Sequence, residues 1–188
     1  MKLIEKPFMF IRHGETDFNL QQTAQGQMDV PLNATGIAQA EAAREVLKDH
    51  EFVTVCCSPL KRAKHTAQAI VRDRSNQLVV IDDLAECHLG IGQGTHRGEW
   101  FDDWRAELAT PDGAEPYAEF LARALRGVNQ ALEHEGPVLI VAHGGIYWSL
   151  QRYAPLDDSS SVANAIPLSF EPPQSGDRHW STTPVSKA

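Results

Sequence analysis

The sequence lacks most features that mark secreted or membrane-bound proteins. It has only three cysteines in 188 residues, and two of them, Cys56 and Cys57, are adjacent, which is poor geometry for a disulfide framework. No apolar run approaches the roughly 18 residues of a membrane-spanning helix, and residues 1–6 lack the apolar stretch of a signal peptide. We therefore expect a protein of the reducing cytoplasm with no membrane partner.

Positive charge is also scarce. The formal net charge is −8 at pH 7 and no basic stripe is visible, which argues against a nucleic-acid partner held by counterion release. Internal repeats, low-complexity tracts and interdomain linkers are absent, and the hydrophobic content of 42% is that of an ordinary globular protein. These features indicate a single domain over residues 1–188, with a homodimer left open as its assembly.

The chain alternates short apolar runs with amphipathic segments. The runs predict buried strands over residues 8–12, 52–57, 78–81 and 138–142. Apolar spacings of three and four predict helices over 33–49 (N-cap Asn33 or Thr35), from Ser58-Pro59 to about residue 70, over 116–134 and over 146–153. This order predicts the α/β class, as a three-layer α/β/α sandwich with a mostly parallel central sheet.

Two further segments are less regular. A glycine-bearing stretch followed by a short helix around residues 100–108 predicts a small lid or insert at about residues 87–115. A strand is predicted over 166–170, and the end of the chain beyond it, rich in proline, serine and threonine, is expected to be loosely held.

Charged and imidazole side chains follow the predicted strands. Arg12 and His13 follow the first strand, Arg62 lies in the first turn of the helix after the second, and Glu86 and His143 follow the third and fourth. The carboxyl ends of parallel strands share one edge of a sheet, where ligands bind. Two guanidiniums, two imidazoles and one carboxyl group suit phosphoryl transfer through a covalent phosphohistidine, because the transition state needs its oxygens positioned and neutralised.

Each of these residues also has a plainer interpretation. A lone histidine after a strand is more often structural, Arg62 alone would be a solvated residue at a helix start, and Glu86 alone is uninformative. Two strand–His–Gly junctions, His13-Gly14 and His143-Gly144, weaken that interpretation. Helices that start near Ser58 and Gly145 would add backbone N–H donors for phosphate oxygens.

A series of short motifs then occurs in one order over about residues 8 to 150. They are Arg12-His13-Gly14-Glu15-Thr16 with Asn19, Gln25-Gly26, Asp29-Val30-Pro31-Leu32, Gly36-Ile37-Ala38-Gln39-Ala40, Ser58-Pro59-Leu60-Lys61-Arg62-Ala63 with Thr66-Ala67, Leu84-Ala85-Glu86 with Gly90 and Gly94, and Ala142-His143-Gly144-Gly145. In this order they resemble the histidine phosphatase superfamily, phosphoglycerate-mutase-like branch.

The resemblance implies a role for each matching residue. His13 would be the nucleophile, accepting the phosphoryl group on one ring nitrogen while the other donates to a backbone carbonyl. Arg12, Arg62 and His143 would bind the phosphate, with His143 cationic in the complex. Glu86 would protonate the departing alcohol and then activate water.

The resemblance also implies a wider phosphate-binding set and no cofactor. Asn19, Gln25, Gly26 and Gly144 would contact the phosphate or the leaving group. No metal is implied.

The chain departs from the family pattern in the lid region. Members of the phosphatase type often carry a tryptophan and a glutamate where this chain has Gly92 and Gln93. The nearby basic and aromatic side chains either line the leaving-group side of the site or lie on the lid surface; they are His88, His96, Arg97, Trp100 and Arg105. Cys87, beside the candidate acid, is interpreted as a packing residue.

The same constellation serves more than one function. The segment between Glu86 and His143 leaves room for two helices and little else. Mutases resemble a longer design, in which extra segments cover the site. A metal-independent phosphatase of the histidine acid type, acting on a small phosphorylated metabolite, is therefore the favoured hypothesis. The alternatives are a phosphoglycerate mutase and a non-catalytic phosphate-binding protein.

Overall fold

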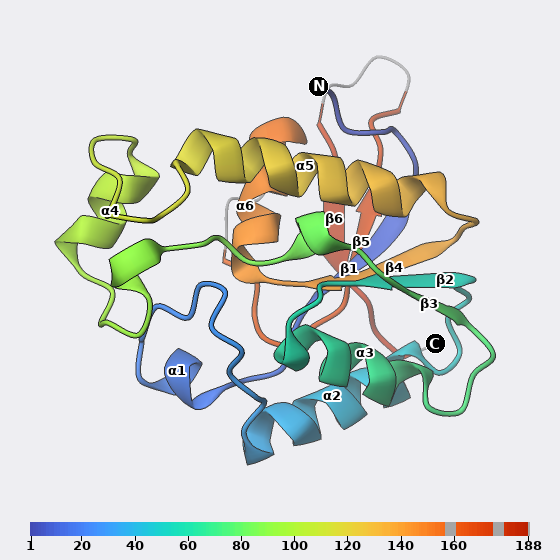
Figure 1. The fold of residues 1–188 in the computed structure, drawn as a ribbon. Coiled ribbons are helices and arrows are strands. Elements are labelled where there is room, and N and C mark those ends of the chain that lie inside the picture. The colour runs from blue at the N-terminus through green and yellow to red at the C-terminus, as the bar shows by residue number, and fades with distance from the viewer. Residues whose placement is uncertain (157–160, 175–178, 188) are drawn as a thin grey trace.

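The computed structural model describes residues 1–156, 161–174 and 179–187. Within them a six-stranded sheet has the order β3-β2-β4-β1-β5-β6 (Figure 1). Its strands are β1 (Phe8–Arg12), β2 (Thr54–Cys57), β3 (Gln77–Val80), β4 (Val138–Ala142), β5 (Leu168–Glu171) and β6 (Ser181–Pro184). The pairings among the first four strands are parallel, and β5 pairs antiparallel with both β1 and β6, so the predicted mostly parallel sheet is confirmed.

Helices cover both faces of the sheet, as the three-layer prediction requires. The helices α5 (Tyr117–Glu133) and α6 (Gly144–Tyr153) lie on one face, and α2 (Ala34–Leu47) and α3 (Lys61–Val71) lie on the other (Figure 1). Neighbouring side chains of a strand point to opposite faces, so Phe10 packs in the α5–α6 layer while Ile11 packs in the α2–α3 layer. Fully burying a side chain of this size stabilises the fold by about 2 kcal/mol.

Local chemistry decides where the helices begin. Asn33, and not Thr35, caps α2, because its side chain accepts a hydrogen bond from the backbone N–H of Gly36. The prediction that α3 begins at Ser58-Pro59 is wrong: α3 begins at Lys61, after Leu60. Leu60 keeps an extended backbone before the helix, with φ −75° and ψ 140°, and the Ser58 hydroxyl accepts the N–H of Leu60 and lies 2.6 Å from the ring of His143.

The end of the chain is better held than its composition predicts. Residues 181–184 form β6, which pairs with β5, and the adjacent Trp180 is buried against the ring of Phe8, with centroids 6.0 Å apart. The sequence Ser-Thr-Thr-Pro lacks the apolar alternation by which strands are recognised, and this pairing is non-local. The expectation of a loosely held end is therefore wrong for residues 179–184.

The segment 87–115, called the lid lobe below, projects from one side of the sandwich and faces the short helix α1 (Asp17–Leu20) (Figure 1). It follows the 3-10 turn η1 (Asp82–Leu84) and contains the turn η2 (Gly90–Gly92) and the helix α4 (Glu99–Arg105). None of the described helices is long and apolar enough to cross a membrane.

Candidate active site

The strand register brings the two predicted histidines together. Arg12, the last residue of β1, pairs with Ala142, the last residue of β4. The next residue of each strand is a histidine, so the rings of His13 and His143 lie side by side, with centroids 5.1 Å apart. Residues far apart in the sequence thus meet at the carboxyl edge of the sheet.

The backbone fixes the tautomer of His13. Its Nδ1 lies 2.7 Å from the carbonyl oxygen of Gly14, which can only accept, so Nδ1 carries the proton. Nε2 is then left with its lone pair. It is approached by the Nε–H of Arg62 at 3.3 Å. His13 therefore presents an unprotonated nitrogen toward a fixed guanidinium, which is the form that a nucleophilic imidazole needs.

Arg62 is fully buried at the start of α3 and is held in place by the backbone. One terminal nitrogen donates to the carbonyl of Gly26 and the other to that of Met28, each at 2.8 Å. Burial lowers the pKa of Arg62 to about 10, with the Glu86 charge opposing, so the guanidinium remains charged at neutral pH. These hydrogen bonds hold the Arg62 guanidinium in place and also hold the loop over residues 25–28.

His143 is buried, and one of its two ring nitrogens has no hydrogen-bond partner. Ser58 accepts the backbone N–H of Leu60, and its hydroxyl lies 2.6 Å from His143 Nε2. The other nitrogen, Nδ1, is buried and has no partner. If the Ser58 hydroxyl donates to Nε2, then Nδ1 carries the proton and is a free donor.

Both imidazoles are held neutral in this environment. Burial lowers the pKa of His13 well below its ordinary value of 6.5, and the charges of Arg62 and Arg12 lower it further. Burial, followed by the same two arginines and His13, acts alike on the pKa of His143. A phosphate dianion entering beside them would oppose the effect of the arginines.

Glu86 lies at the N-terminus of α6. One carboxylate oxygen accepts the backbone N–H of Gly145 at 3.2 Å, and the other accepts that of Cys87 at 3.0 Å. A Cβ at Gly145 would lie 2.1 Å from this carboxylate, so only glycine leaves room for it. The backbone N–H of Gly145, which was predicted to donate to phosphate oxygens, instead donates to the candidate acid. Burial raises the pKa of the Cys87 thiol well above its ordinary value, with Glu86 adding to the effect, so the thiol stays protonated.

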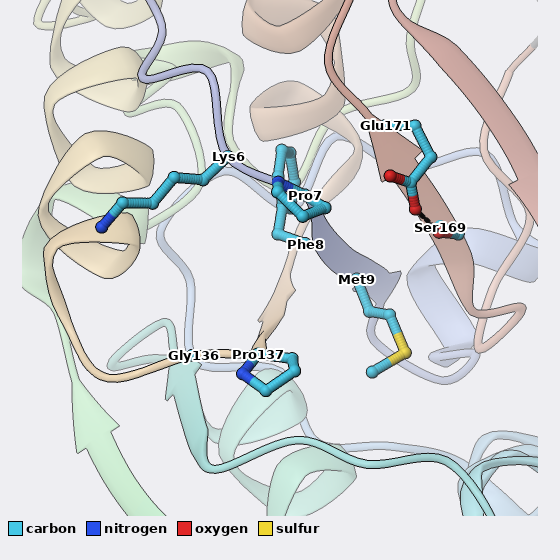
Figure 2. A pocket seen from close by; sticks show the side chains of 8 residues that line it. All are labelled: Lys6, Pro7, Phe8, Met9, Gly136, Pro137, Ser169 and Glu171. Carbon is cyan, nitrogen blue, oxygen red and sulfur yellow. Dashed lines mark hydrogen bonds between the residues drawn. The ribbon is translucent and has the colours of Figure 1, made fainter.

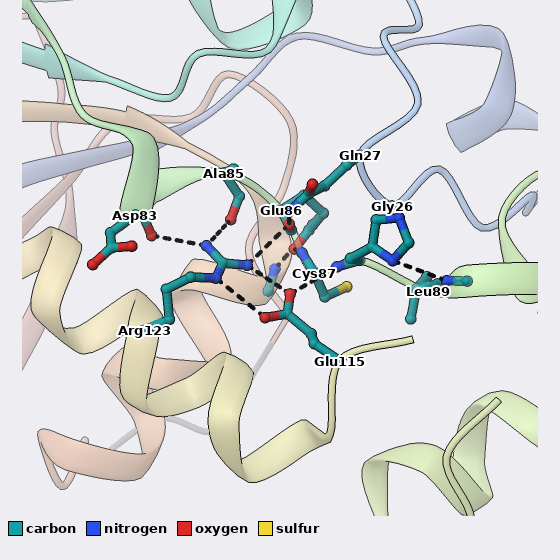
Figure 3. Close-up of polar contacts among 12 residues, drawn as sticks. Gly26, Gln27, Asp83, Ala85, Glu86, Cys87, Leu89, Glu115 and Arg123 are labelled. Carbon is teal, nitrogen blue, oxygen red and sulfur yellow. Dashed lines mark hydrogen bonds and ion pairs between the residues drawn. The ribbon is translucent and has the colours of Figure 1, made fainter. Parts of the chain in front are cut away.

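A half-buried arginine that the sequence analysis did not single out holds the Glu86 segment (Figure 3). Arg123 of α5 donates to the carbonyls of Asp83, Ala85 and Glu86 at 3.0–3.2 Å, and pairs with the carboxylate of Glu115 at 2.6 Å. We call Arg123 with Glu115 the loop clamp. Its signal in the sequence is positional, because Arg123 lies three residues after the buried Phe120 on an inward-facing turn.

A small cavity lies between these side chains. It measures about 20 Å³, which is room for about one water molecule. Its lining residues are Arg12, His13, Ala24, Gln25, Gly26, Arg62, Glu86, Cys87, Leu89, Arg97, Phe101 and Trp148.

Unsatisfied polar atoms gather at this cavity. In the described part of the chain, four buried side-chain atoms lack a hydrogen-bond partner: Arg12 Nε, Gln25 Oε1, Arg97 Nε and His143 Nδ1. Three belong to residues that line the cavity, and the fourth is in the ring beside His13. Buried polar atoms are rarely left unpaired, and here the available donors outnumber the acceptors, so the cavity is built for an anion.

The wider predicted set is placed unevenly. Gln25 and Gly26 line the cavity, and Gly144 begins α6 with its Cα facing the guanidinium of Arg12. Asn19 is not among the lining residues; it lies within α1, and its side chain accepts the backbone N–H of the N-cap residue Thr16 to complete a capping box. The structure thus brings Gln25 and Gly26 to the cavity, whereas the side chain of Asn19 stabilises the start of α1.

Only one of the five lid residues lines the cavity, and it is Arg97. The ring of Trp100, from α4, lies next to Gly92, and a Cβ at position 92 would be only 2.6 Å from that ring. Trp100 therefore occupies space next to position 92, where members of the phosphatase type often carry a tryptophan. Gln93 is used structurally, since its Oε1 accepts the backbone N–H of Gln27 at 2.8 Å.

The other three lid residues lie elsewhere. His88 Nδ1 contacts the carbonyl of Gly113 at 2.8 Å, and His96 is exposed. Arg105 is not a lining residue; its guanidinium lies over the ring of Trp148 in α6, 4.5 Å from the ring centroid. No group of three or more histidine, cysteine, aspartate or glutamate residues that could hold a metal occurs among the residues that the structure describes.

Comparison with known proteins identifies the family to which the chain belongs. The sequence profile of the histidine phosphatase superfamily, branch 1, matches residues 8–163. The chain belongs to this family. It is 40% identical over 141 residues to the uncharacterized phosphatase PhoE of Bacillus subtilis (strain 168), covering 74% of this chain and 72% of that one. The family predicted from the ordered motifs is confirmed.

Two further relatives extend the match. The chain is 31% identical over 186 residues to a metal-independent phosphoserine phosphatase of Arabidopsis thaliana, covering 92% of this chain and 77% of that one. The crystal structure of the α-ribazole phosphatase from Shigella flexneri superposes with a TM-score of 0.80 at 26% identity, covering 97% of this chain and 96% of that one. The histidine phosphatase fold thus spans nearly the whole chain.

Proposed function

We propose that this protein is a metal-independent phosphatase that hydrolyses small phosphomonoesters through a phosphohistidine on His13. The observation that carries the proposal is the unprotonated Nε2 of His13, which accepts the Nε–H of Arg62 at 3.3 Å beside a cavity that holds unpartnered donors. The named relatives support hydrolysis, because those reported above are all called phosphatases. Their substrates differ from one another, so none is transferred to this chain.

The first step is attack on phosphorus. The lone pair of His13 Nε2 forms the N–P bond while the bond from phosphorus to the ester oxygen breaks. Glu86, in its protonated form, gives its proton to the departing oxygen, so the leaving group departs as a neutral alcohol. Arg12, Arg62 and the Nδ1–H of His143 balance the charge on the phosphoryl oxygens.

The second step releases phosphate. Water attacks phosphorus opposite His13, and the ionised carboxylate of Glu86 takes its proton. The N–P bond then breaks, which returns the neutral imidazole and restores the protonated carboxyl group. The hydrogen bond from His13 Nδ1 to Gly14 keeps the ring in place through both steps.

The test is turnover of para-nitrophenyl phosphate with and without a chelator. The proposal expects turnover that the chelator leaves unchanged and that the substitution His13→Ala removes. Loss of turnover with chelator would point to a metal-dependent reaction instead. Vanadate binding with no turnover would identify a phosphate-binding protein.

A second assay separates hydrolysis from transfer. The protein is incubated with 3-phosphoglycerate and a trace of bisphosphoglycerate. The proposal expects free phosphate to form faster than 2-phosphoglycerate, because water is the acceptor. The reverse order would make the protein a mutase.

A further inference from the structure

Arg97 is fixed at the boundary between the lid lobe and the cavity. Its backbone N–H donates to the carbonyl of Gln22 at 3.2 Å, and the preceding His96 bridges to Thr23. These two contacts connect the lid lobe to residues 22–23, which precede the 25–28 loop. Arg97 therefore reaches the cavity from the lid lobe, whereas His13 follows a strand of the sheet.

The guanidinium of Arg97 is unusually free. Its Nε is buried without a hydrogen-bond partner, and its Cζ lies 5.4 Å from the ring centroid of Phe101. No carboxylate of the described residues forms an ion pair with it. Burial lowers the pKa of Arg12, Glu86 opposes that effect, and the charge of Arg97 adds to it, so Arg97 acts on the same site.

The other arginines around the site have protein partners. Arg12 donates to the carbonyl of Val162 at 3.1 Å, and Arg62 holds two carbonyls of the 25–28 loop. Arg123 is paired within the loop clamp. A half-buried guanidinium whose buried Nε has no acceptor loses hydration that the contact with the Phe101 ring only partly replaces, so its place is explained by a ligand.

The charge balance indicates what that ligand carries. When Glu86 holds the proton that the leaving group needs, the charged residues that line the cavity are Arg12, Arg62 and Arg97. A phosphate dianion matches two of these three positive charges. One positive charge, on the lid side, remains for a second anionic group on the same substrate.

We propose that Arg97 is a specificity-determining residue that binds a carboxylate on the alcohol part of the phosphomonoester. The inference rests on the proposed phosphatase function and names its substrate class, phosphorylated hydroxy acids. A carboxylate is planar and accepts two parallel hydrogen bonds from one guanidinium. The Nε–H of Arg97 has no partner, so the edge of the guanidinium that includes Nε can make such a pair. The apolar walls of Phe101 and Trp148 exclude water there and strengthen the contact.

Two pairs of esters test this inference. They are 3-phosphoglycerate with glycerol 3-phosphate, and 2-phosphoglycerate with glycerol 2-phosphate. Within each pair the carboxylate is replaced by a hydroxymethyl group and the phosphate is unchanged. The wild-type protein is expected to prefer the acid by tenfold or more in kcat/KM in at least one pair. The substitution Arg97→Gln should lower that preference by tenfold or more.

Arg105→Gln is the matched control, because it removes the same charge from the same lobe at a site outside the cavity. It should leave the preference unchanged. Arg97→Lys keeps the positive charge but lacks the paired N–H donors of a guanidinium, and it should retain more of the preference than Arg97→Gln. Equal losses in these two variants would contradict a role based on charge.

The outcomes separate this inference from the function on which it rests. Turnover that needs His13 but shows no preference for the acids, or a preference that survives Arg97→Gln, overturns the inference alone. A dependence on Arg97 seen only with a bisphosphate, such as fructose 1,6-bisphosphate against fructose 6-phosphate, overturns the carboxylate assignment. Absence of turnover that depends on His13, with every ester, overturns the phosphatase function as well.

Discussion

The two ends of the central sheet carry cavities of very different size and chemistry. At the carboxyl ends of β1 and β4 the enclosed space is only about 20 Å³, and it lies among arginines and histidines. At the amino ends of the same strands a cavity of about 500 Å³ opens (Figure 2). It is lined by Lys6, Pro7, Phe8, Met9, Gly136, Pro137, Ser169 and Glu171.

The difference lies in how the polar groups are satisfied. At the amino end, Lys6 donates to the carbonyl of Leu132 at 2.9 Å, and Ser169 donates to Glu171 at 3.1 Å. At the carboxyl end, unpartnered buried atoms point to a ligand. Of these two cavities, volume alone would thus favour the amino end, and unsatisfied hydrogen-bonding capacity favours the carboxyl end, where the candidate active site lies.

The largest expected effect follows from removing the nucleophile at the carboxyl end. His13→Ala should reduce kcat/KM for para-nitrophenyl phosphate by about 10⁴-fold or more, because no phosphohistidine can form. Steady-state assays check this, with circular dichroism to establish that the variant is folded. Activity within 100-fold of the wild type would assign the nucleophile to another residue.

The next effect is on charge stabilisation. Arg62→Ala should lower kcat by about 10²- to 10³-fold, the scale of losing one preorganised donor at a developing charge. It should also lower stability, since the carbonyls of Gly26 and Met28 lose their buried partner. Kinetics and urea denaturation measure the two effects. A change in kcat of a fewfold would show that this guanidinium is not directed at the phosphate.

The loop clamp should matter less than the residues that it positions. Arg123→Met frees three carbonyls of the segment that carries Glu86, and we expect kcat to fall by about tenfold with an altered pH–rate profile. Arg126→Met is the control, because Arg126 pairs with Asp83 on the exposed side of the same helix. Equal effects in the two variants would mean that α5 acts only through general stability.

The buried imidazoles make the carboxyl end sensitive to acid. The pKa of both His13 and His143 is lowered well below 6.5, so below pH 6.5 the unfolded chain binds protons that the folded one does not. The free energy of unfolding should be constant above about pH 6.5 and fall on acidification, by up to about 1.4 kcal/mol per pH unit for each ring. Urea denaturation between pH 8 and pH 5 measures the slope, which His143→Gln should reduce.

The smallest effect is expected at the amino end. Lys6→Met removes a charge from the larger cavity and one hydrogen bond to Leu132, and kcat/KM should remain within about twofold of the wild type. A tenfold loss of activity would show that this cavity is coupled to the reaction and would break the contrast between the two ends.

The sequence predicted the parts of the fold that depend on local periodicity. The apolar runs of β1 and β4 and the amphipathic face of α5 are such parts, and each lies within two residues of its predicted bounds. The strand β6 was missed because it is recognised only through its pairing with β5. The start of α3 was placed too early because Leu60 keeps an extended backbone, so the helix begins only at Lys61.

The site shows the same division. His13, Arg62 and His143 follow recognisable strands or motifs, so their convergence could be predicted. Arg123 could not, because its carbonyl partners become close only when η1 and α5 pack together. Arg97 was foreseen only as one of five lid residues, since nothing in the sequence tells which of them enters the cavity.

Rapid-quench trapping of the phosphoenzyme tests the central claim most directly. The protein is mixed with a ³²P-labelled phosphomonoester, stopped in alkali, and digested, and the labelled peptide is sequenced. The account predicts a label that is stable in alkali and lost in acid, carried by the peptide containing His13 and absent from His13→Ala. A label on another residue, or turnover with no labelled protein at any time, would contradict it.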